Sequence, residues 1–205
     1  MNEKQDQIKF GTLKTEHIPD VAQLHIMGIK EGFFGSLGNK FVCCLYRAII
    51  ESDQAFGFVA IKEGKVLGFV SCVESIKRVY KHIIRKNFFK FTWMLLPKMF
   101  RWQNIKNTVA TLLYPSKIKK VLPSAEILTI VVNKQVRGIG VGRRLIEQSC
   151  DEFRKRGIKW IKVIAGEDQQ ADEFYKTVGF ELADQSQRRG VLLNIYVMKV
   201  SNDER

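Results

Sequence analysis

The chain has 205 residues, of which 45% are hydrophobic and 11% aromatic, and it carries a formal net charge of +13 at pH 7. A chain of this length and composition buries a full core, which excludes intrinsic disorder and favours one domain over residues 1–205. No apolar run approaches the roughly 20 residues that a membrane-spanning helix needs, and residues 1–10 are too polar for a secretory signal. We therefore expect a cytoplasmic protein.

The first half of the chain predicts an antiparallel arrangement. Residues 8–13 have the pattern of a strand, and the segment that follows shows helical spacing at Ile18, Val21, Leu24 and Ile29. A second helix is expected over residues 39–50. The stretch "AFGFVAIKEGKVLGFVSCVE" then predicts two strands joined in a hairpin at Glu63-Gly64.

The second half alternates strands and helices. We predict strands over residues 126–132 and 160–165, helices over residues 142–156 and 170–178, and a last strand in "VLLNIYVMKV". A strand–helix–strand unit implies parallel pairing. The fold class is therefore α/β, with a mixed antiparallel and parallel central sheet flanked by helices.

The stretch "QVRGIGVGRRL" contains glycines at alternate positions, Gly138, Gly140 and Gly142. Such a loop before a helix can turn backbone N–H groups toward an anion, and Arg137, Arg143 and Arg144 add positive charge. The spacing fits neither a P-loop nor a dinucleotide fingerprint. From these residues alone, a phosphate site and a flexible turn with a solvated basic edge both stay open.

Two motifs resemble the GNAT superfamily of acyl-CoA-dependent N-acyltransferases. The first has the form [QR]xxGx[GA] and is met by Arg137, Gly140 and Gly142. The second, "EDQQADEFYKTVGFEL", is similar to NxxAxxFYxxxGF, with Asp168 in place of the usual Asn. The order of elements also resembles that family over nearly all of the chain outside residues 75–122. Residues 74–122 then form a basic, aromatic-rich insertion before the cofactor-binding strand.

The resemblance implies acetyl-CoA as acyl donor. Its pyrophosphate would lie in the glycine loop, and its pantetheine arm would run along the edge of residues 130–132, where the strand from Trp160 is expected to splay away. The implied cofactor-binding residues are Ile130, Val131, Val132, Arg137, Gly138, Ile139, Gly140, Val141, Gly142, Arg143, Asp168, Ala171 and Tyr175.

The chemistry requires a base, because a primary amine with a pKa near about 10 is protonated at neutral pH. The resemblance points to Glu126 for this role, with Glu74 as the reserve candidate, and to Tyr175 as the acid that protonates the departing thiolate. A strand-end surface charge and a core tyrosine are the structural alternatives for Glu126 and Tyr175. A backbone N–H near Val131 or Val132 is expected to hold the oxyanion.

We assign structural roles to the histidines and cysteines of the chain. His25 and His82 have no evident orienting carboxylate, so packing or solvation is the expected role of each. The cysteines form no CxxC pair and show no zinc spacing, so we expect free thiols and no metal site. They are Cys43, Cys44, Cys72 and Cys150.

No Asp or Glu occurs between Glu74 and Glu126, whereas this segment holds twelve cations. They are Lys77, Arg78, Lys81, Arg85, Lys86, Lys90, Lys98, Arg101, Lys106, Lys117, Lys119 and Lys120. The aromatic stretch "NFFKFTWMLLPKMFRW" lies among them. We expect residues 77–120 to form a helical cap over the acceptor side that recognises an anion.

Three anions compete for the basic segment: a phosphorylated acceptor such as a nucleotide-linked amino compound, an anionic membrane surface, and nucleic acid. Nucleic acid ranks last, since no recognisable binding module is present. We expect an N-acetyltransferase that acts on an anionic primary amine. The alternatives are a non-catalytic acyl-CoA sensor and an acyltransferase peripheral to the inner membrane face, acting on a protein or lipid-linked amine.

Overall fold

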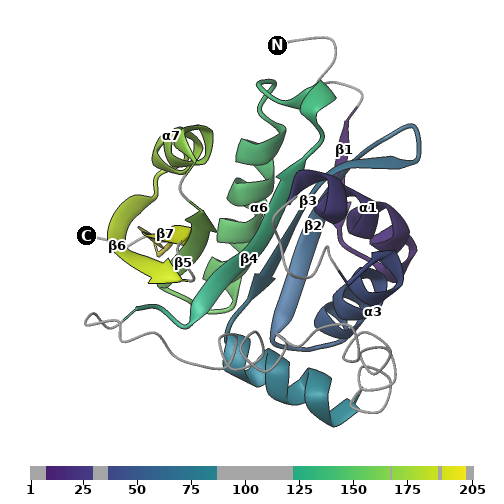
Figure 1. The fold of residues 1–205 in the computed structure, drawn as a ribbon, viewed down its shortest axis with the longest axis horizontal. Helices are drawn as coiled ribbons and strands as arrows, with labels where there is room; N and C mark the ends of the chain where they lie inside the picture. The colour runs from purple at the N-terminus through teal and green to yellow at the C-terminus, as the bar shows by residue number, and fades with distance from the viewer. Residues whose placement is uncertain (1–7, 30–36, 87–121, 167, 189–190, 202–205) are drawn as a thin grey trace.

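A seven-stranded sheet with the strand order β1-β2-β3-β4-β5-β7-β6 forms the centre of the protein (Figure 1). The computed structural model describes residues 8–29, 37–86, 122–166, 168–188 and 191–201. The strands are β1 (Lys9–Thr12), β2 (Ala55–Lys62), β3 (Lys65–Val73), β4 (Ala125–Val132), β5 (Trp160–Gly166), β6 (Glu181–Arg188) and β7 (Val191–Lys199). In this order, β4 and β5 lie at the middle of the sheet.

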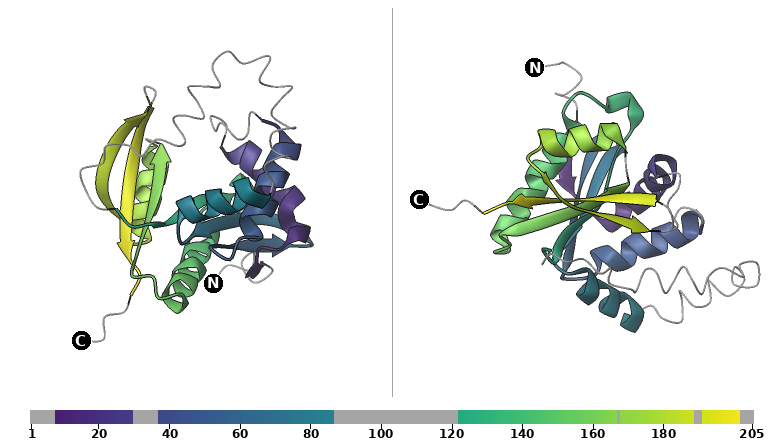
Figure 2. Two further views of the ribbon diagram at one scale, coloured as in Figure 1. Left: turned by 90° about the horizontal axis from the view of Figure 1, so that it is seen from below. Right: turned by 60° about the vertical axis from the view of Figure 1, so that its left-hand side comes forward.

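Helices cover both faces of the first half of the sheet. Helices α1 (Ile18–Gly28) and α3 (Asn39–Ile50) lie on one face, and α6 (Val141–Lys155) lies on the other (Figure 2). The alternation of side chains along a strand divides the core in the same way. Val59 and Phe69 pack with α1 and α3, while Phe56 and Val70 pack with α6.

The centre of the sheet opens between β4 and β5, the parallel pair among the described strands. Their pairing covers Ala125–Ile161, Glu126–Lys162 and Ile127–Val163, and it stops there. At the same point β4 has an irregular register against β3, because Ser71 is opposite Thr129 while Cys72 is opposite Ile127. A bulge of this kind bends a strand. The predicted splay of the two strands is therefore confirmed.

The predicted mixed sheet and hairpin are confirmed, and the observed helix bounds differ from the predicted ones by about one residue at most positions. One strand was not predicted: β6 pairs antiparallel with β7, between helix α7 (Gln169–Thr177) and the last strand. Its sequence, "ELADQSQR", has none of the β-branched and aromatic residues that favour strands. Pairing with β7 therefore overrides a weak local preference.

Residues 76–86 form a helix directly after β3, on the same side of the sheet as α1 and α3 (Figure 2, left). This is the described part of the expected helical cap; residues 87–121, which carry the rest of that prediction, lie outside the described residues. In the described ranges, no helix is long and apolar enough to cross a membrane.

Candidate active site

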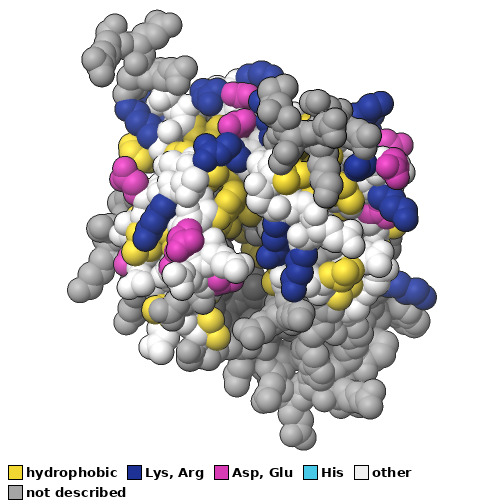
Figure 3. All heavy atoms as spheres, turned by 90° about the horizontal axis from the view of Figure 1, so that it is seen from above, with side chains coloured by type: hydrophobic (Ala, Val, Ile, Leu, Met, Phe, Trp, Pro, Cys, Tyr) yellow, Lys and Arg dark blue, Asp and Glu magenta, His cyan; other side chains and the backbone are white. Residues whose placement is uncertain are grey.

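One cavity lies where the β4–α6 loop meets α7. It has a volume of about 520 Å³. Figure 3 views this end of the molecule and shows a hollow bordered by basic, acidic and hydrophobic side chains. The predicted cofactor residues that line this cavity are Ile130, Val132, Arg137, Gly138, Gly140, Val141, Gly142, Arg143, Asp168, Ala171 and Tyr175.

Glycine is required in this loop for two different physical reasons. Gly138 and Gly140 have φ values of 78° and 88°, in the left-handed region that side chains disfavour. Gly140 is the N-cap of α6, so this turn directs the chain into the helix. Gly142 instead allows close packing, because a Cβ there would stand 3.1 Å from a ring carbon of Phe174. The loop is thus shaped both by its turn and by the contact of α6 with α7.

Two of the three arginines expected at the anion site line the cavity. The Nε of Arg137 donates to the carbonyl of Val132 at 3.2 Å, and Arg143 Nη2 donates to the carbonyl of Thr177 at 3.3 Å. These bonds join the loop to β4 and α6 to α7. Arg144 is not among the lining residues and pairs with Glu147 at 3.4 Å on an exposed surface. The first turn of α6 contains no acidic residue, so its N-terminus is an electropositive site for an anion.

The open edge of β4 presents the backbone of Ile130 and Val132. The N–H of Asn133 donates to the carbonyl of Leu67 in β3 at 2.8 Å. In an antiparallel pair, residues bonded to the partner strand alternate with residues whose backbone groups face away. Counting back from Asn133, the groups of Val131 face β3, while those of Ile130 and Val132 face the gap left by β5.

Val131 and Ile139 therefore differ from the other predicted cofactor-binding residues. The side chain of Val131 is buried in the core formed with α1 and α3, and Ile139 is half-buried in the core beneath α6. Neither lines the cavity. Of the two backbone donors proposed for the oxyanion, only the N–H of Val132 faces the open edge, because strand alternation turns that of Val131 toward β3.

Tyr175 contributes to the cavity wall from α7 although its ring is packed in the core. The residue is 7% exposed, and its ring centroid lies 5.4 Å from that of Phe174, 5.7 Å from that of Phe180 and 5.3 Å from that of Tyr196. Burial raises the pKa of the Tyr175 phenol. The hydroxyl therefore keeps its proton at neutral pH, as a proton donor must.

A polar network fixes the ring of Tyr196 against Tyr175. The hydroxyl of Tyr196 donates to the carboxylate of Asp172, and the side-chain amide of Asn194 donates to the same oxygen at 3.0 Å. The two hydrogen bonds keep the pKa of the Asp172 carboxyl low. They also tie β7 to α7, so the position of Tyr175 depends on both elements.

Asp168 is the N-cap of α7. Its carboxylate accepts a hydrogen bond from the backbone N–H of Gln170 at 2.9 Å, which satisfies one of the unpaired donors at the start of the helix. An Asn side chain forms the same bond, so the replacement of the usual Asn preserves the cap. Sequence reasoning missed five other lining residues that follow from the spacing of α7 and from the loop: Val136, Gln170, Phe174, Thr177 and Val178.

Glu126 lies at the start of β4, immediately before the point at which β5 separates. Its carboxylate is half-buried and 3.2 Å from the ammonium of Lys162, which also donates to the carbonyl of Pro123. Burial raises the pKa of the Glu126 carboxyl, and Lys162 opposes this rise. The reserve candidate Glu74 instead forms an ion pair with Arg156 at 2.8 Å, and Arg156 also bonds Glu152 and covers the ring of Phe56. Glu74 is therefore part of a structural cluster.

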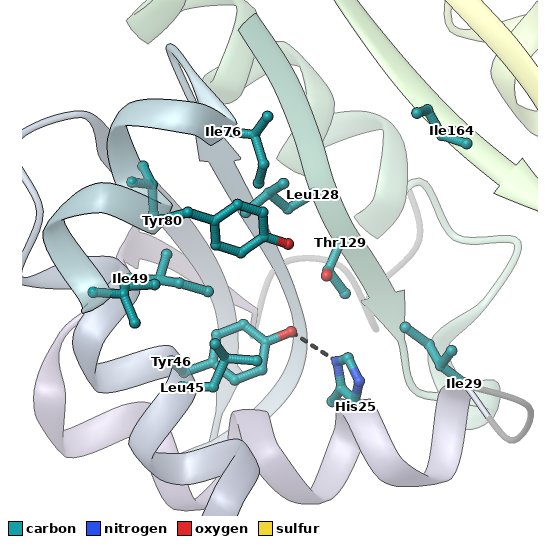
Figure 4. A pocket seen from close by; sticks show the side chains of 12 residues that line it. His25, Ile29, Leu45, Tyr46, Ile49, Ile76, Tyr80, Leu128, Thr129 and Ile164 are labelled. Atoms are coloured by element: carbon teal, nitrogen blue, oxygen red, sulfur yellow. Dashed lines mark hydrogen bonds between the residues drawn. The ribbon is translucent and has the colours of Figure 1, made fainter. Parts of the chain in front are cut away.

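The second cavity, of about 280 Å³, lies on the α1 and α3 side of the sheet. Figure 4 shows residues of five elements around it: α1, α3, helix 76–86, β4 and β5. Its polar groups belong to His25, Tyr46, Tyr80 and Thr129, and the other lining residues are Ile29, Leu45, Ile49, Ile76, Val79, Ile83, Leu128 and Ile164. Nothing in the sequence pattern groups these residues, since they come from distant segments.

Comparisons with known proteins agree with this geometry. Residues 119–200 match the family profile described as the Acetyltransferase (GNAT) domain. An uncharacterized N-acetyltransferase of Methanocaldococcus jannaschii is 41% identical over 58 residues, which are 28% of this chain and 26% of that protein. The match thus spans about a quarter of the length of that relative.

Solved structures share the fold at low sequence identity. The ribosomal-protein-S18-alanine N-acetyltransferase of Escherichia coli is 14% identical with a TM-score of 0.60, and the alignment covers 97% of this chain and 98% of that one. A putative acetyltransferase of Salmonella typhimurium, solved with its cofactor acetyl-CoA, is 12% identical with a TM-score of 0.61 and 97% coverage of each chain. Residues 119–200 thus match the GNAT acetyltransferase domain, and the fold of the chain is similar to those of solved acetyltransferases.

Proposed function

We propose that the protein transfers an acetyl group from acetyl-CoA to a primary amine. The observation that carries the proposal is the arrangement of two cavities along one strand. Ile130 and Val132 line the cavity at the glycine loop, and Leu128 and Thr129 line the apolar cavity on the other side. A thioester entering from the first cavity and an amine entering from the second would meet at the open edge of β4.

In this proposal the pyrophosphate of acetyl-CoA lies at the N-terminus of α6. Arg137 and Arg143 supply charge-assisted hydrogen bonds, and the loop backbone supplies further N–H donors. The pantetheine arm pairs with the backbone groups of Ile130 and Val132 that face the gap. The N–H of Val132 then holds the oxygen that becomes negative when the amine attacks.

The reaction joins the amine nitrogen to the carbonyl carbon and breaks the bond from that carbon to sulfur. An ammonium nitrogen loses two protons as it becomes an amide. Glu126 receives one, directly or through water, and the raised pKa of its carboxyl makes it a stronger base than an exposed glutamate. Tyr175 supplies a proton to the thiolate, so that coenzyme A leaves as a thiol, and the phenol regains its proton from the nitrogen.

The acceptor is an amine with an anionic group outside the cavity. Five of the twelve cations of the basic segment are described: Lys77, Arg78, Lys81, Arg85 and Lys86. All five are exposed, and none lines the apolar cavity, because the opposite face of helix 76–86 contributes Ile76, Val79 and Ile83 to it. An anion bound there would sit at the rim. This assignment, and the proposal that residues 74–122 are an insertion within one domain, rest on the sequence.

The test is release of free thiol from acetyl-CoA with a panel of primary amines that includes phosphorylated and unphosphorylated pairs. We expect Tyr175→Phe to lower kcat by roughly a hundredfold or more while CoA affinity stays unchanged, as for loss of a general acid. Glu126→Gln should lower kcat at every pH. Wild-type turnover in either variant would remove that role, and CoA binding without turnover on any amine would favour the acyl-CoA sensor.

Contact of the basic segment with a membrane is tested separately. Salt-sensitive sedimentation of the protein with anionic liposomes would support it, since cations near a membrane surface act through screened electrostatics.

A further inference from the structure

The apolar cavity contains one buried polar atom whose partner is missing from the described residues. His25 is 5% exposed, and its Nδ1 lies 2.8 Å from the hydroxyl oxygen of Tyr46 (Figure 4). The other ring nitrogen, Nε2, is buried and has no hydrogen-bond partner within the described part of the chain. Buried polar atoms in proteins are nearly always hydrogen-bonded. An unpaired nitrogen in a cavity wall is therefore a point at which a ligand can supply a hydrogen-bond donor or acceptor.

The protonation state of His25 decides which kind of ligand this is. Burial lowers the pKa of the imidazole below its ordinary 6.5. Among the described lining residues, the other titratable groups are Tyr46 from α3 and Tyr80 from helix 76–86, while β4 and β5 contribute Leu128, Thr129 and Ile164. No carboxylate faces the ring from these residues to stabilise an imidazolium. His25 is therefore neutral at pH 7, with one N–H and one lone pair.

The hydrogen bond to Tyr46 allows the lone pair to be on Nε2. When Nδ1–H donates to the Tyr46 oxygen, the hydroxyl proton of Tyr46 is directed elsewhere, and the side chains of Thr129 and Ser71 interact with this hydroxyl. In that tautomer Nε2 is an acceptor. We propose that the cavity holds the apolar body of the acceptor substrate and that Nε2 of His25 accepts a hydrogen bond from its primary amine. This inference rests on the proposed function and specifies its acceptor.

Size and polarity restrict the part of the acceptor inside the cavity to an amine on one apolar group. The cavity volume of about 280 Å³ is near the lower end of the range of about 300–1,000 Å³ for small-molecule sites. The described lining contains no Lys, Arg, Asp or Glu, so a second charged group has no partner inside. The same surroundings disfavour an ammonium ion, which lowers the pKa of the bound amine and increases the fraction that can attack. His25 is thus a binding residue that orients the nucleophile.

Two sources have this chemistry: a free arylalkylamine and a peptide whose first residue is apolar. The probes are phenethylamine and a short peptide amide beginning with leucine. The matched control compound is 2-phenylethanol, which has the same ring without the nitrogen. Histidine-selective ¹⁵N NMR of the full chain resolves the question directly, because the protein has three histidines.

We expect phenethylamine or the leucyl peptide to shift the Nε2 resonance of His25 and 2-phenylethanol to shift it less. His25→Phe should weaken binding of the effective probe by about tenfold or more, as for loss of one buried hydrogen bond to a charged or strongly polar group. His25→Asn, which keeps an acceptor, should recover part of the affinity. CoA affinity should be unchanged in both variants.

His82 provides the control histidine. Its Nε2 is also buried without a partner in the described ranges, but the residue does not line the cavity, so His82→Phe should leave probe binding unchanged. A His25 resonance that neither probe shifts overturns the inference. Thiol release with an amine that does not perturb His25 overturns it as well and leaves the acetyltransferase proposal standing. Binding at His25 without thiol release from any amine would leave this inference standing and would overturn the acetyltransferase proposal.

Discussion

The proposed coenzyme cavity, at the glycine loop, and the proposed acceptor cavity, lined by His25 and Tyr46, share β4 but are built in different ways. Two short stretches of sequence form the coenzyme cavity, residues 130–143 and 168–178, through backbone groups, glycines and two arginines. Five elements between His25 and Ile164 form the acceptor cavity, and its lining residues are dispersed along the chain. A ligand recognised by backbone and loop geometry leaves a motif in the sequence, whereas a ligand recognised by dispersed side chains does not.

Filling the acceptor cavity alone should have a large effect on acetyl transfer. Ile164 lines that cavity from β5 and is 38% exposed, so a larger side chain there can be accommodated without unfolding the core. We expect Ile164→Trp to reduce acetyl transfer by about tenfold or more, because the acceptor loses most of its space. CoA affinity, measured by calorimetry, should stay at the wild-type value.

Leu182→Trp is the matched control, since Leu182 is similarly exposed on β6 and lines neither cavity. If Ile164→Trp weakened CoA binding as much as acetyl transfer, the two cavities would not be separate sites. If it left acetyl transfer unchanged, the amine would enter by another route.

A smaller effect is expected at Glu126, the proposed base at the start of β4. Burial raises the pKa of the Glu126 carboxyl and the Lys162 ammonium opposes that rise, so Lys162→Met should raise the pKa further. Because the base must be deprotonated, the acid limb of the pH dependence of acetyl transfer should move to higher pH. The folded state then binds this proton at a higher pH than the unfolded chain does, so stability should increase as the pH falls through the raised pKa toward the ordinary pKa of the unfolded glutamate.

Carbon-13 NMR of labelled glutamate side chains measures this titration. Lys159→Met, which removes an exposed lysine just before β5, is the control and should leave Glu126 unchanged. A Glu126 titration that does not move in Lys162→Met would show that the ion pair at 3.2 Å has no electrostatic effect on the carboxyl.

Particular residues show how far the sequence could predict the fold and the site. Periodicity predicted α3 and the hairpin because each is specified by neighbours along the chain. The polar strand β6 was missed because its pairing with β7 is a tertiary effect. Val131 was included among the cofactor residues because a motif gives a range, whereas its orientation depends on the register with β3.

His25 shows the same limit within the site. The sequence favoured a structural role for it, since a single histidine on an apolar helix face has no pattern that indicates a ligand. Its partner Tyr46 lies 21 residues away on another helix, and Thr129 comes from a strand still farther along the chain. Such a group can be recognised only once the fold has brought its members together.

The central claim, that the loop before α6 binds the pyrophosphate of CoA, is tested most directly by two neighbouring arginines. Arg143 lines the cavity, whereas Arg144 pairs with Glu147 outside it. By calorimetry, Arg143→Glu should weaken CoA binding by roughly 10- to 100-fold, as for loss of a charge-assisted phosphate contact, while Arg144→Glu changes it by about twofold or less. Neither variant should alter the affinity for pantetheine, which lacks the pyrophosphate. Equal losses in both variants, or unchanged CoA affinity in Arg143→Glu, would contradict the claim.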